Sequence, residues 1–176
     1  MSEPSGAERS PPAASVTLAG LPRRLAAIVY DSLLLLGVLV GATALALGLA
    51  VAVLGSEPVR LYNPLAANPF FQTYLLLVCF FFYGGFWTHG GQTLGMRVWR
   101  LRVQRRAGGG MSWWQALLRF LIGGLWLFPA VYLHRAPGIS VGLSLTAGLG
   151  VLLVILALRL PDRASETELV VLPKKP

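Results

Sequence analysis

The sequence predicts an all-α integral membrane protein with four transmembrane helices and a small cytoplasmic β-ribbon. Three observations lead to this fold class. First, only 12 % of the 176 residues are charged and 55 % are hydrophobic, whereas an ordinary soluble domain carries about 25 % charged residues. Second, the apolar residues are gathered into four long runs. Third, the basic residues lie mostly on one side of these runs.

The segments before and after the apolar runs are short and polar. Residues 1–17 are rich in Ser, Pro and Ala and lack hydrophobic periodicity, so we expect a disordered cytoplasmic tail. Residues 173–176 form a second tail. The four runs between these tails are 25–54, 70–88, 113–133 and 139–158. Each reaches the roughly 20 residues that a helix needs to cross about 30 Å of hydrocarbon, and the first, which is longer, is expected to tilt.

The distribution of Lys and Arg predicts the orientation of the four helices. The amino-terminal tail, the 89–112 loop and the carboxyl-terminal tail would lie on one side of the membrane. These segments hold Arg9, Arg23, Arg24, Arg97, Arg100, Arg102, Arg105, Arg106, Arg159, Arg163, Lys174 and Lys175. The other side holds only Arg60 and Arg135. Basic loops stay in the cytoplasm, so both termini are predicted to be cytoplasmic, and the basic composition needs no nucleic-acid partner. Arginine outnumbers lysine thirteen to two, which hints at a GC-rich bacterial genome. For a bacterial multi-pass protein with this charge distribution, we expect the inner (cytoplasmic) membrane.

The 89–112 loop has the pattern of a short strand. Trp99, Leu101 and Val103 alternate with polar residues, the period of two that a half-buried strand shows. The segment TELVVL at 167–172 is the other β-like stretch on this side, so we expect the two to pair as a ribbon. A rival interpretation is an amphipathic helix over 93–106. The two interpretations can also coexist, with a helical turn over 93–99 followed by the strand.

Asp31 is the polar residue that most needs an explanation, because it lies within the first apolar run. An acid in that position costs about 2–3 kcal/mol unless it is paired or hydrated. Arg24 is seven residues away on nearly the same helix face, about 10 Å along the axis. This gap is too long for a simple contact, so Asp31 is expected to have access to water or a partner elsewhere. The candidate partners are Arg119, Gln92 and Thr93.

Two interpretations of Asp31 stay open at the level of sequence. In one, Asp31 and Arg119 form a buried ion pair that holds the helices together. In the other, Asp31 binds an ion or takes part in transport, since ionisable groups within the membrane are functional candidates. Asp162, just after the fourth run, would on its own be interpreted as a helix cap, a turn residue or a surface partner of Arg163.

No pattern in the chain indicates an enzyme, a cofactor or a metal site. The stretch GGQTLGMR fits neither a Walker motif nor a strand–GxGxxG–helix context. Its glycines are expected to turn the chain out of the second span, with Thr93 capping a short helix. His89 and His134 fall on opposite sides of the predicted membrane, and Cys79 is the single cysteine. The arrangements typical of hydrolases and metalloenzymes do not occur.

Four motifs, in order along the chain, resemble the RDD family of membrane proteins. RRLAAIVYD resembles its opening motif and GQTLGMRVWRLRV its loop signature, while MSWWQALLRFL and LPDRASETELVV resemble the segments that follow. The family's arginine and two aspartates correspond to Arg24, Asp31 and Asp162, and a recurrent arginine corresponds to Arg119. The closing motif usually has Gly where this chain has Glu166. The resemblance covers residues 18–172 as one membrane domain.

The resemblance implies a transport role for ions or other small ligands, with proton-coupled cation exchange proposed for some members of the family. It suggests that Arg24, Asp31, Arg119 and Asp162 form one ligand- or ion-binding cluster near the cytoplasmic leaflet. The supporting loop would contribute Gln92, Thr93 and Gly95. The alternative is a non-transporting membrane scaffold whose Arg/Asp cluster is structural. The expected partners are the lipid bilayer and further copies of the chain, because four spans enclose little room for a pathway; the ligand is not identified.

Overall fold

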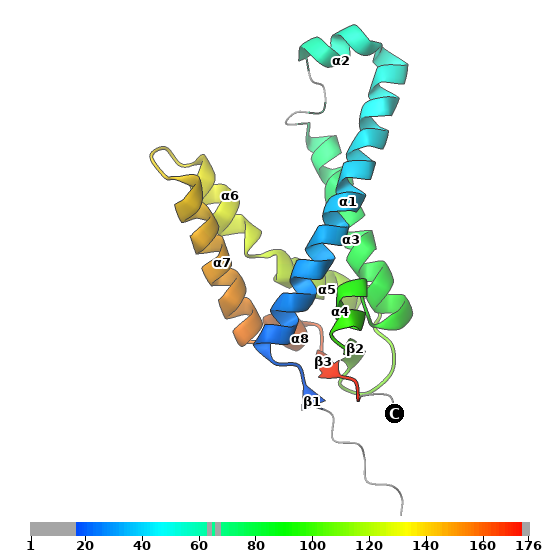
Figure 1. Cartoon of the computed structure of the whole chain (residues 1–176), viewed down its shortest axis with the longest axis vertical. Coiled ribbons are helices and arrows are strands. Elements are labelled where there is room, and N and C mark those ends of the chain that lie inside the picture. The colour runs from blue at the N-terminus through cyan, green and yellow to red at the C-terminus, as the bar shows by residue number, and fades with distance from the viewer. Residues whose placement is uncertain (1–16, 63–64, 66–67, 174–176) are drawn as a thin grey trace, which may run out of the picture.

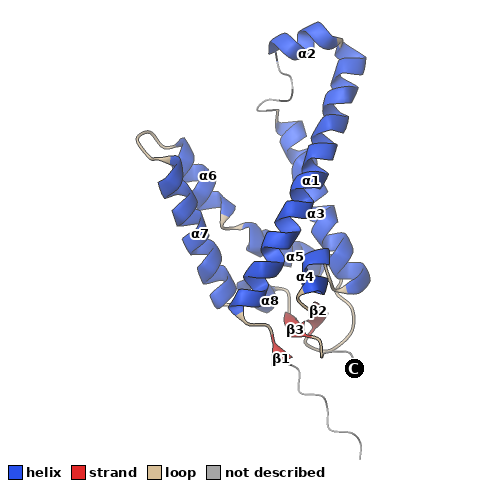
Figure 2. Ribbon diagram, in the orientation of Figure 1, coloured by secondary structure: helices blue, strands red, loops and turns tan. Residues whose placement is uncertain are grey.

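The computed structural model describes residues 17–62, 65 and 68–173. This part of the chain is mostly helical, with three short strands at one end (Figure 2). The helices are α1 (Leu21–Leu54), α2 (Ser56–Tyr62), α3 (Pro69–Gly90), α4 (Leu94–Val98), α5 (Trp113–Gly124), α6 (Leu127–Arg135), α7 (Val141–Ala157) and α8 (Leu160–Ala164). The strands are β1 (Thr17–Leu18), β2 (Leu101–Arg105) and β3 (Thr167–Val171).

Two helical arms rise from a common base (Figure 1). One arm consists of α1 and α3, and the other consists of α6 and α7. The base contains α4, α5, α8 and the three strands. The two arms diverge away from the base, so α2 and the turn between α6 and α7 lie at the far ends of the molecule.

The first two apolar runs form α1 and α3, with bounds close to those predicted. Helix α1 begins at Leu21, four residues earlier than expected, because Gly20 is the extended cap residue and Pro22 occupies the first turn, where its missing N–H costs nothing. Helix α3 begins after Asn68, whose side chain accepts hydrogen bonds from two backbone N–H groups of the first turn. The predicted external loop between the two runs contains the short helix α2.

The predicted third span over 113–133 is not one continuous helix. The segment is broken into α5 and α6, with a bend of 40°. Pro129 has no N–H to donate to the carbonyl of Leu125, and Gly123 and Gly124 precede the break. Proline and paired glycines are among the usual causes of helix kinks. These residues were visible in the sequence and could have signalled the bend.

Length and composition make α1 and α3 candidate membrane spans, and the bent α5–α6 pair is a third if it is counted as one span. The fourth apolar run forms α7, which has 17 residues against the 20 of the predicted run at 139–158. At 1.5 Å per residue, α7 is about 26 Å long. The described chain therefore has two or three helices that satisfy the criteria for a membrane span, together with one shorter apolar helix.

The strands form a three-stranded antiparallel sheet in the order β1-β3-β2. The β2–β3 pair is the predicted ribbon, with Leu101 opposite Val171 and Arg105 opposite Thr167. Leu101 and Val103 are buried and Arg102 is exposed, as the alternation predicted. Trp99, predicted on the same face as Leu101, instead lies before the strand as the cap residue of α4 and is exposed. Helix α4 precedes β2, so the helical turn and the strand coexist.

The third strand was not predicted, because β1 falls at the end of the segment interpreted as a disordered tail. Thr17 lies opposite Val171 and Leu18 opposite Val170. Residues 1–16 of the predicted tail and residues 174–176 of the second tail lie outside the described residues. The strand is only two residues long and has no alternation of its own, so no sequence period could reveal it.

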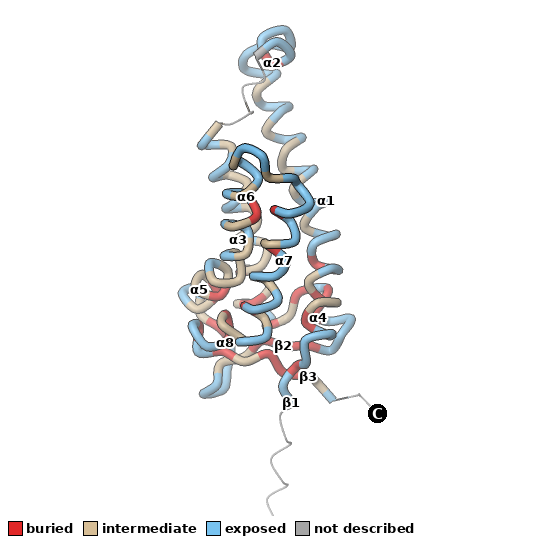
Figure 3. Tube along the Cα trace, turned by 90° about the vertical axis from the view of Figure 1, so that its left-hand side faces the viewer, coloured by how far each residue is buried: buried red, intermediate tan, exposed pale blue. Residues whose placement is uncertain are grey.

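The buried residues gather at the base rather than along the arms (Figure 3). The main hydrophobic cluster joins Ala27 of α1 and Trp87 of α3 to Met96, Leu101 and Leu169 from α4 and the sheet. The outer parts of α1, α3, α6 and α7 instead expose many leucines, valines and aromatic rings, which is the surface expected of helices in contact with lipid.

Candidate functional site

Asp162 lies between two buried arginines from different helices. Its Oδ2 accepts a hydrogen bond of 2.7 Å from Nη2 of Arg24 on α1, and its Oδ1 accepts one of 2.5 Å from Nη1 of Arg119 on α5. All three side chains are at least nine-tenths buried. We call these three residues the Arg–Asp–Arg triad. The predictions of a cap, a turn residue or a surface pair for Asp162 were wrong, because the chain folds back and buries α8 against α5.

Two further hydrogen bonds join the triad to backbone and hydroxyl groups. Nε of Arg24 donates to the carbonyl of Ala19 at 3.1 Å, and Nη1 of Arg119 also donates to Oγ1 of Thr167 at 3.0 Å. The guanidinium carbon of Arg119 lies 5.6 Å from the centre of the Trp87 ring, a cation–π distance. The triad therefore ties α1, α5, α8 and β3 together at the base.

Asp31 forms a separate set of contacts with the segment that precedes and begins α4. Its Oδ2 accepts a hydrogen bond from the hydroxyl of Thr93, and its Oδ1 accepts one of 2.9 Å from the backbone N–H of Gly95. The carboxylate is buried, with 2 % of the residue exposed. Thr93 was among the predicted partners, and this prediction is confirmed. Gln92 was also a candidate, but it donates instead to the carbonyl of Leu101 at 2.6 Å.

The proposed ion pair between Asp31 and Arg119 does not form. Among the residues that the structure describes, the acidic partner of Arg119 is Asp162, and Asp31 has no ion pair with an arginine or lysine. The expected single cluster is therefore divided by its contacts into the triad and the Asp31 site. Arg24 and Asp31 are both on α1, but each points to a different partner.

Local sequence explains how α4 reaches Asp31. Helix α3 ends at Gly90, and the cap residue Gly91 has a φ of +68°, a left-handed conformation that suits glycine. Thr93 then caps α4, as predicted, by accepting a hydrogen bond from the N–H of Met96 at 3.2 Å. A methyl group at Gly95 would lie 2.5 Å from the carbonyl oxygen of Ala27. Glycine at this position therefore lets the backbone of α4 touch α1 directly.

Several residues of the site were not anticipated from the sequence. Ala19 and Thr167 support the triad, and Trp87 lies beside Arg119. Thr167 belongs to the closing motif and could have been noticed there. Ala19 contributes only a carbonyl and Trp87 only a ring face, so neither carries a signal that a sequence pattern can show.

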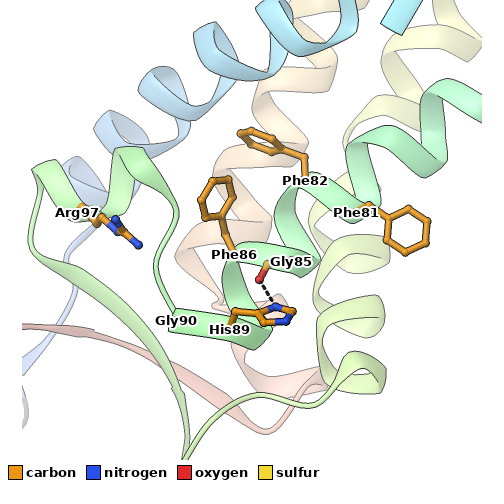
Figure 4. Close-up of a pocket in the computed structure, with 7 residues that line it drawn as sticks. All are labelled: Phe81, Phe82, Gly85, Phe86, His89, Gly90 and Arg97. Atoms are coloured by element: carbon orange, nitrogen blue, oxygen red, sulfur yellow. Dashed lines mark hydrogen bonds between the residues drawn. The ribbon is translucent and has the colours of Figure 1, made fainter.

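Two cavities in the described part of the chain lie away from Asp31 and the triad, which line neither of them. One, of about 450 Å³, lies on α3 beside α4 (Figure 4). The other, of about 490 Å³, is largely apolar and lies between the far half of α1 and the start of α3. No group of three or more His, Cys, Asp or Glu side chains that could hold a metal occurs among the described residues.

Comparison with known proteins finds a match at the level of the family. Residues 18–165 match the RDD family, a range that contains the triad and the Asp31 site. The curated proteins and the solved structures contain no match to the chain. The family match covers most of the sequence and agrees with the four motifs identified above. This membrane-type protein therefore belongs to the RDD family.

Proposed function

We propose that the chain transports ions or other small ligands across a bacterial cytoplasmic membrane, with Asp31 as the protonatable or ion-binding group. The proposal rests on a difference in hydrogen-bond partners between the two buried aspartates, Asp162 and Asp31. Asp162 has two arginines within hydrogen-bond distance, which is the environment of a structural carboxylate. Among the residues that the structure describes, Asp31 accepts only from a hydroxyl and an amide, so its negative charge is left for a proton or a cation to balance.

Two polar groups of α3 that have no hydrogen bond within the described chain support the same proposal. Tyr83 lies close enough to Asp31 to interact with it electrostatically, and its hydroxyl has no hydrogen bond within the described chain. Its ring stacks on Trp87, with the ring centres 5.4 Å apart. The indole N–H of Trp87 is buried and, among the described residues, it has no hydrogen-bond partner. Buried polar groups without partners are uncommon and are frequently explained by water, ions or ligands.

Access to Asp31 would require movement of α4. This five-residue helix covers the carboxylate through Thr93 and Gly95, and it is joined to α3 by a glycine-containing turn. Its displacement would break two hydrogen bonds to Asp31 and uncover the acid. We propose that α4 opens when a proton or cation replaces these two donors, and that more than one copy of the chain encloses the pathway.

We also propose four membrane crossings with both termini in the cytoplasm. The bent α5–α6 pair would be the third crossing and α7 the fourth, with flanking residues completing its length. The base carries the arginines of α4 and β2, whereas Arg60 and Arg135 lie at the far ends of the two arms. This asymmetry supports a cytoplasmic base.

Cysteine labelling tests the orientation. In a Cys79→Ser background, Glu57→Cys would react with a membrane-impermeant maleimide in intact spheroplasts, and Arg106→Cys would react only after lysis. Both positions are exposed, so accessibility depends on the side of the membrane. Labelling of Arg106→Cys in intact spheroplasts would refute the proposed orientation.

A non-transporting scaffold is the second candidate function, and the depth of burial favours it. Asp31 and the triad are almost entirely shielded from solvent, and the two described cavities do not reach them. In this case both sites serve only to join helices, and the protein acts through a partner in the membrane.

A flux measurement separates the two candidates. The purified protein is reconstituted in liposomes, and a pH gradient is used to drive uptake of sodium or potassium. Asp31→Asn keeps the shape of the side chain but removes its charge, so transport predicts that flux falls to the protein-free background. The matched control is Glu57→Gln, an acid exposed on α2, which should leave flux unchanged.

The scaffold is supported if the wild type shows no flux above background while Asp31→Asn lowers the thermal midpoint and a stoichiometric partner is recovered by pull-down. Transport is contradicted if wild type and Asp31→Asn give the same flux for every cation tested. Wild-type flux that Asp31→Asn abolishes, at an unchanged thermal midpoint, would establish Asp31 as a transport residue rather than a packing residue.

A further inference from the structure

The cavity on α3 has a glycine at its centre and aromatic rings around it. Gly85 lies one helical turn from Phe81, Phe82 and His89 and next to Phe86, all of which line the cavity (Figure 4). A Cβ added at Gly85 would meet nothing within 4 Å, so a larger side chain at this position would extend into the hollow. We call this hollow, completed by Gly90 and Arg97, the α3 hollow.

The two ends of the α3 hollow differ in chemistry. Phe81 and Phe82 lie toward the middle of α3, whereas His89 is next to its last residue. Arg97 extends from α4 on the side of Phe86 and of Gly90, the last residue of α3 (Figure 4). Since eight residues of helix span about 12 Å, an elongated molecule could lie along the hollow with an apolar part against the phenylalanines and a polar part near the basic end.

The charge of Arg97 points to an anion. Within the described chain its guanidinium has no ion pair and no hydrogen bond, unlike the two arginines of the triad. Arginine stays protonated and presents a planar set of donors that fits phosphate oxygens in a bidentate manner. An exposed, unpaired arginine at the end of an apolar hollow is therefore complementary to a phosphate that carries an acyl chain.

His89 adds a second contact at this end. Its Nδ1 lies 2.9 Å from the carbonyl oxygen of Gly85, and a carbonyl can only accept, so Nδ1 carries the hydrogen. In the neutral ring Nε2 is then an acceptor. It can accept a hydrogen bond from a headgroup hydroxyl while Arg97 binds the phosphate.

From these observations we infer that the α3 hollow binds one anionic glycerophospholipid. An acyl chain lies against Phe81, Phe82 and Phe86, and the phosphate lies at Arg97. The surface of α3 is apolar and long enough to cross a membrane, so a lipid reaches the hollow laterally from the bilayer. This site is distinct from Asp31 and does not depend on the proposed transport function.

Native mass spectrometry tests the site with purified full-length protein. The protein is equilibrated in detergent with equal amounts of phosphatidylglycerol and phosphatidylcholine, and the lipids that remain bound are counted. The wild type is expected to retain one phosphatidylglycerol in preference to phosphatidylcholine. Arg97→Gln should reduce this preference about tenfold, as expected for loss of a charge-assisted contact. Gly85→Leu should abolish retention of both lipids by filling the hollow.

Two matched variants control for general effects. Arg106→Gln removes the same charge from an exposed position outside the hollow, and Gly41→Leu adds the same side chain to α1, where a Cβ has open space. Both should bind lipid as the wild type does. Circular dichroism checks the fold of each variant. If Arg97→Gln does not fold, the comparison of Gly85→Leu with the wild type and with Gly41→Leu tests the site.

Three results would overturn the inference. The first is equal lipid preference in Arg97→Gln and Arg106→Gln. The second is full retention of phosphatidylglycerol by correctly folded Gly85→Leu. The third is complete displacement of the lipid by inorganic phosphate, because the hollow would then bind a soluble anion rather than a phospholipid.

Discussion

Replacement of Gly95 by alanine tests the contact between α4 and α1 most directly. The added methyl would lie 2.5 Å from the carbonyl oxygen of Ala27 and 2.9 Å from Cγ and Oδ1 of Asp31. Real Cβ atoms essentially never approach this closely, and a backbone oxygen cannot rotate away. Helix α4 must therefore move off α1, and the hydrogen bond from the Gly95 N–H to Asp31 lengthens or breaks.

The magnitude follows from three effects. Overpacking costs about 1–3 kcal/mol, and loss of a hydrogen bond to a charged group costs about 1.5–3 kcal/mol. Alanine recovers about 1 kcal/mol of helix propensity relative to glycine. The three effects together give an expected loss in the free energy of unfolding of about 1.5–5 kcal/mol. For a protein of this size, such a loss lowers the thermal midpoint by roughly 3–20 °C.

Circular dichroism of the detergent-solubilised protein during heating measures this midpoint. The matched control is Gly41→Ala, also a glycine-to-alanine change within a helix but at a position where a Cβ has open space; it should leave the midpoint unchanged or slightly higher. A double variant with Asp31→Asn should lose less than the sum of the single losses, because both changes weaken one contact. Equal midpoints for Gly95→Ala and Gly41→Ala would refute the packing of α4 on α1.

Three further predictions concern the base and the second arm, and the same thermal measurement checks each. Asp162→Asn leaves two buried guanidinium groups without their acid, so it should lower the free energy of unfolding by about 3–5 kcal/mol. The control Glu57→Gln breaks an exposed ion pair and should change this free energy by less than about 1 kcal/mol. Similar losses in the two variants would contradict a buried triad. Glu166→Gly should raise the stability by about 1 kcal/mol, because the residue has a φ of +53°, a left-handed conformation that strains side chains other than glycine; a lower midpoint would refute this. Gly148→Ala should cost about 1–3 kcal/mol because its Cβ would lie 2.8 Å from a methyl group of α6. Gly150→Ala, where a Cβ has open space, should cost nothing, and equal effects at the two glycines would argue against close packing of α6 on α7.

The position of Glu166 connects the family pattern to backbone geometry. The closing motif usually has glycine at this position, and the left-handed φ explains why. The turn directs the chain from α8 into β3, where Thr167 contacts Arg119. In this chain Glu166 adopts the left-handed turn with local strain. We therefore expect the replacement of the family's usual glycine to lower the stability of the protein and to leave the path of the backbone as it is.

Features governed by local patterns were predictable from the sequence. The apolar runs located α1 and α3, the alternation around Leu101 located β2, and Thr93 was recognised as the cap of α4. The isolated acid in an apolar run also identified Asp31 as a residue in need of a partner. Each of these inferences depends on the helical or strand period or on the cost of burying a charge, which act within a few residues of the chain.

The pairing of the buried charges was decided only by the tertiary structure. Asp162 is 138 residues from Arg24 and 43 from Arg119, and no local pattern indicates that α8 folds back between them. Asp31 likewise accepts a hydrogen bond from the backbone N–H of Gly95. Every residue other than proline has a backbone N–H, so no sequence pattern identifies this partner. The sequence by itself determined which polar residues lie in apolar surroundings and need a partner. Only the packing of α1, α4, α5, α8 and β3 at the base determined which of these residues contact one another, because contacts between distant segments depend on how the whole chain packs.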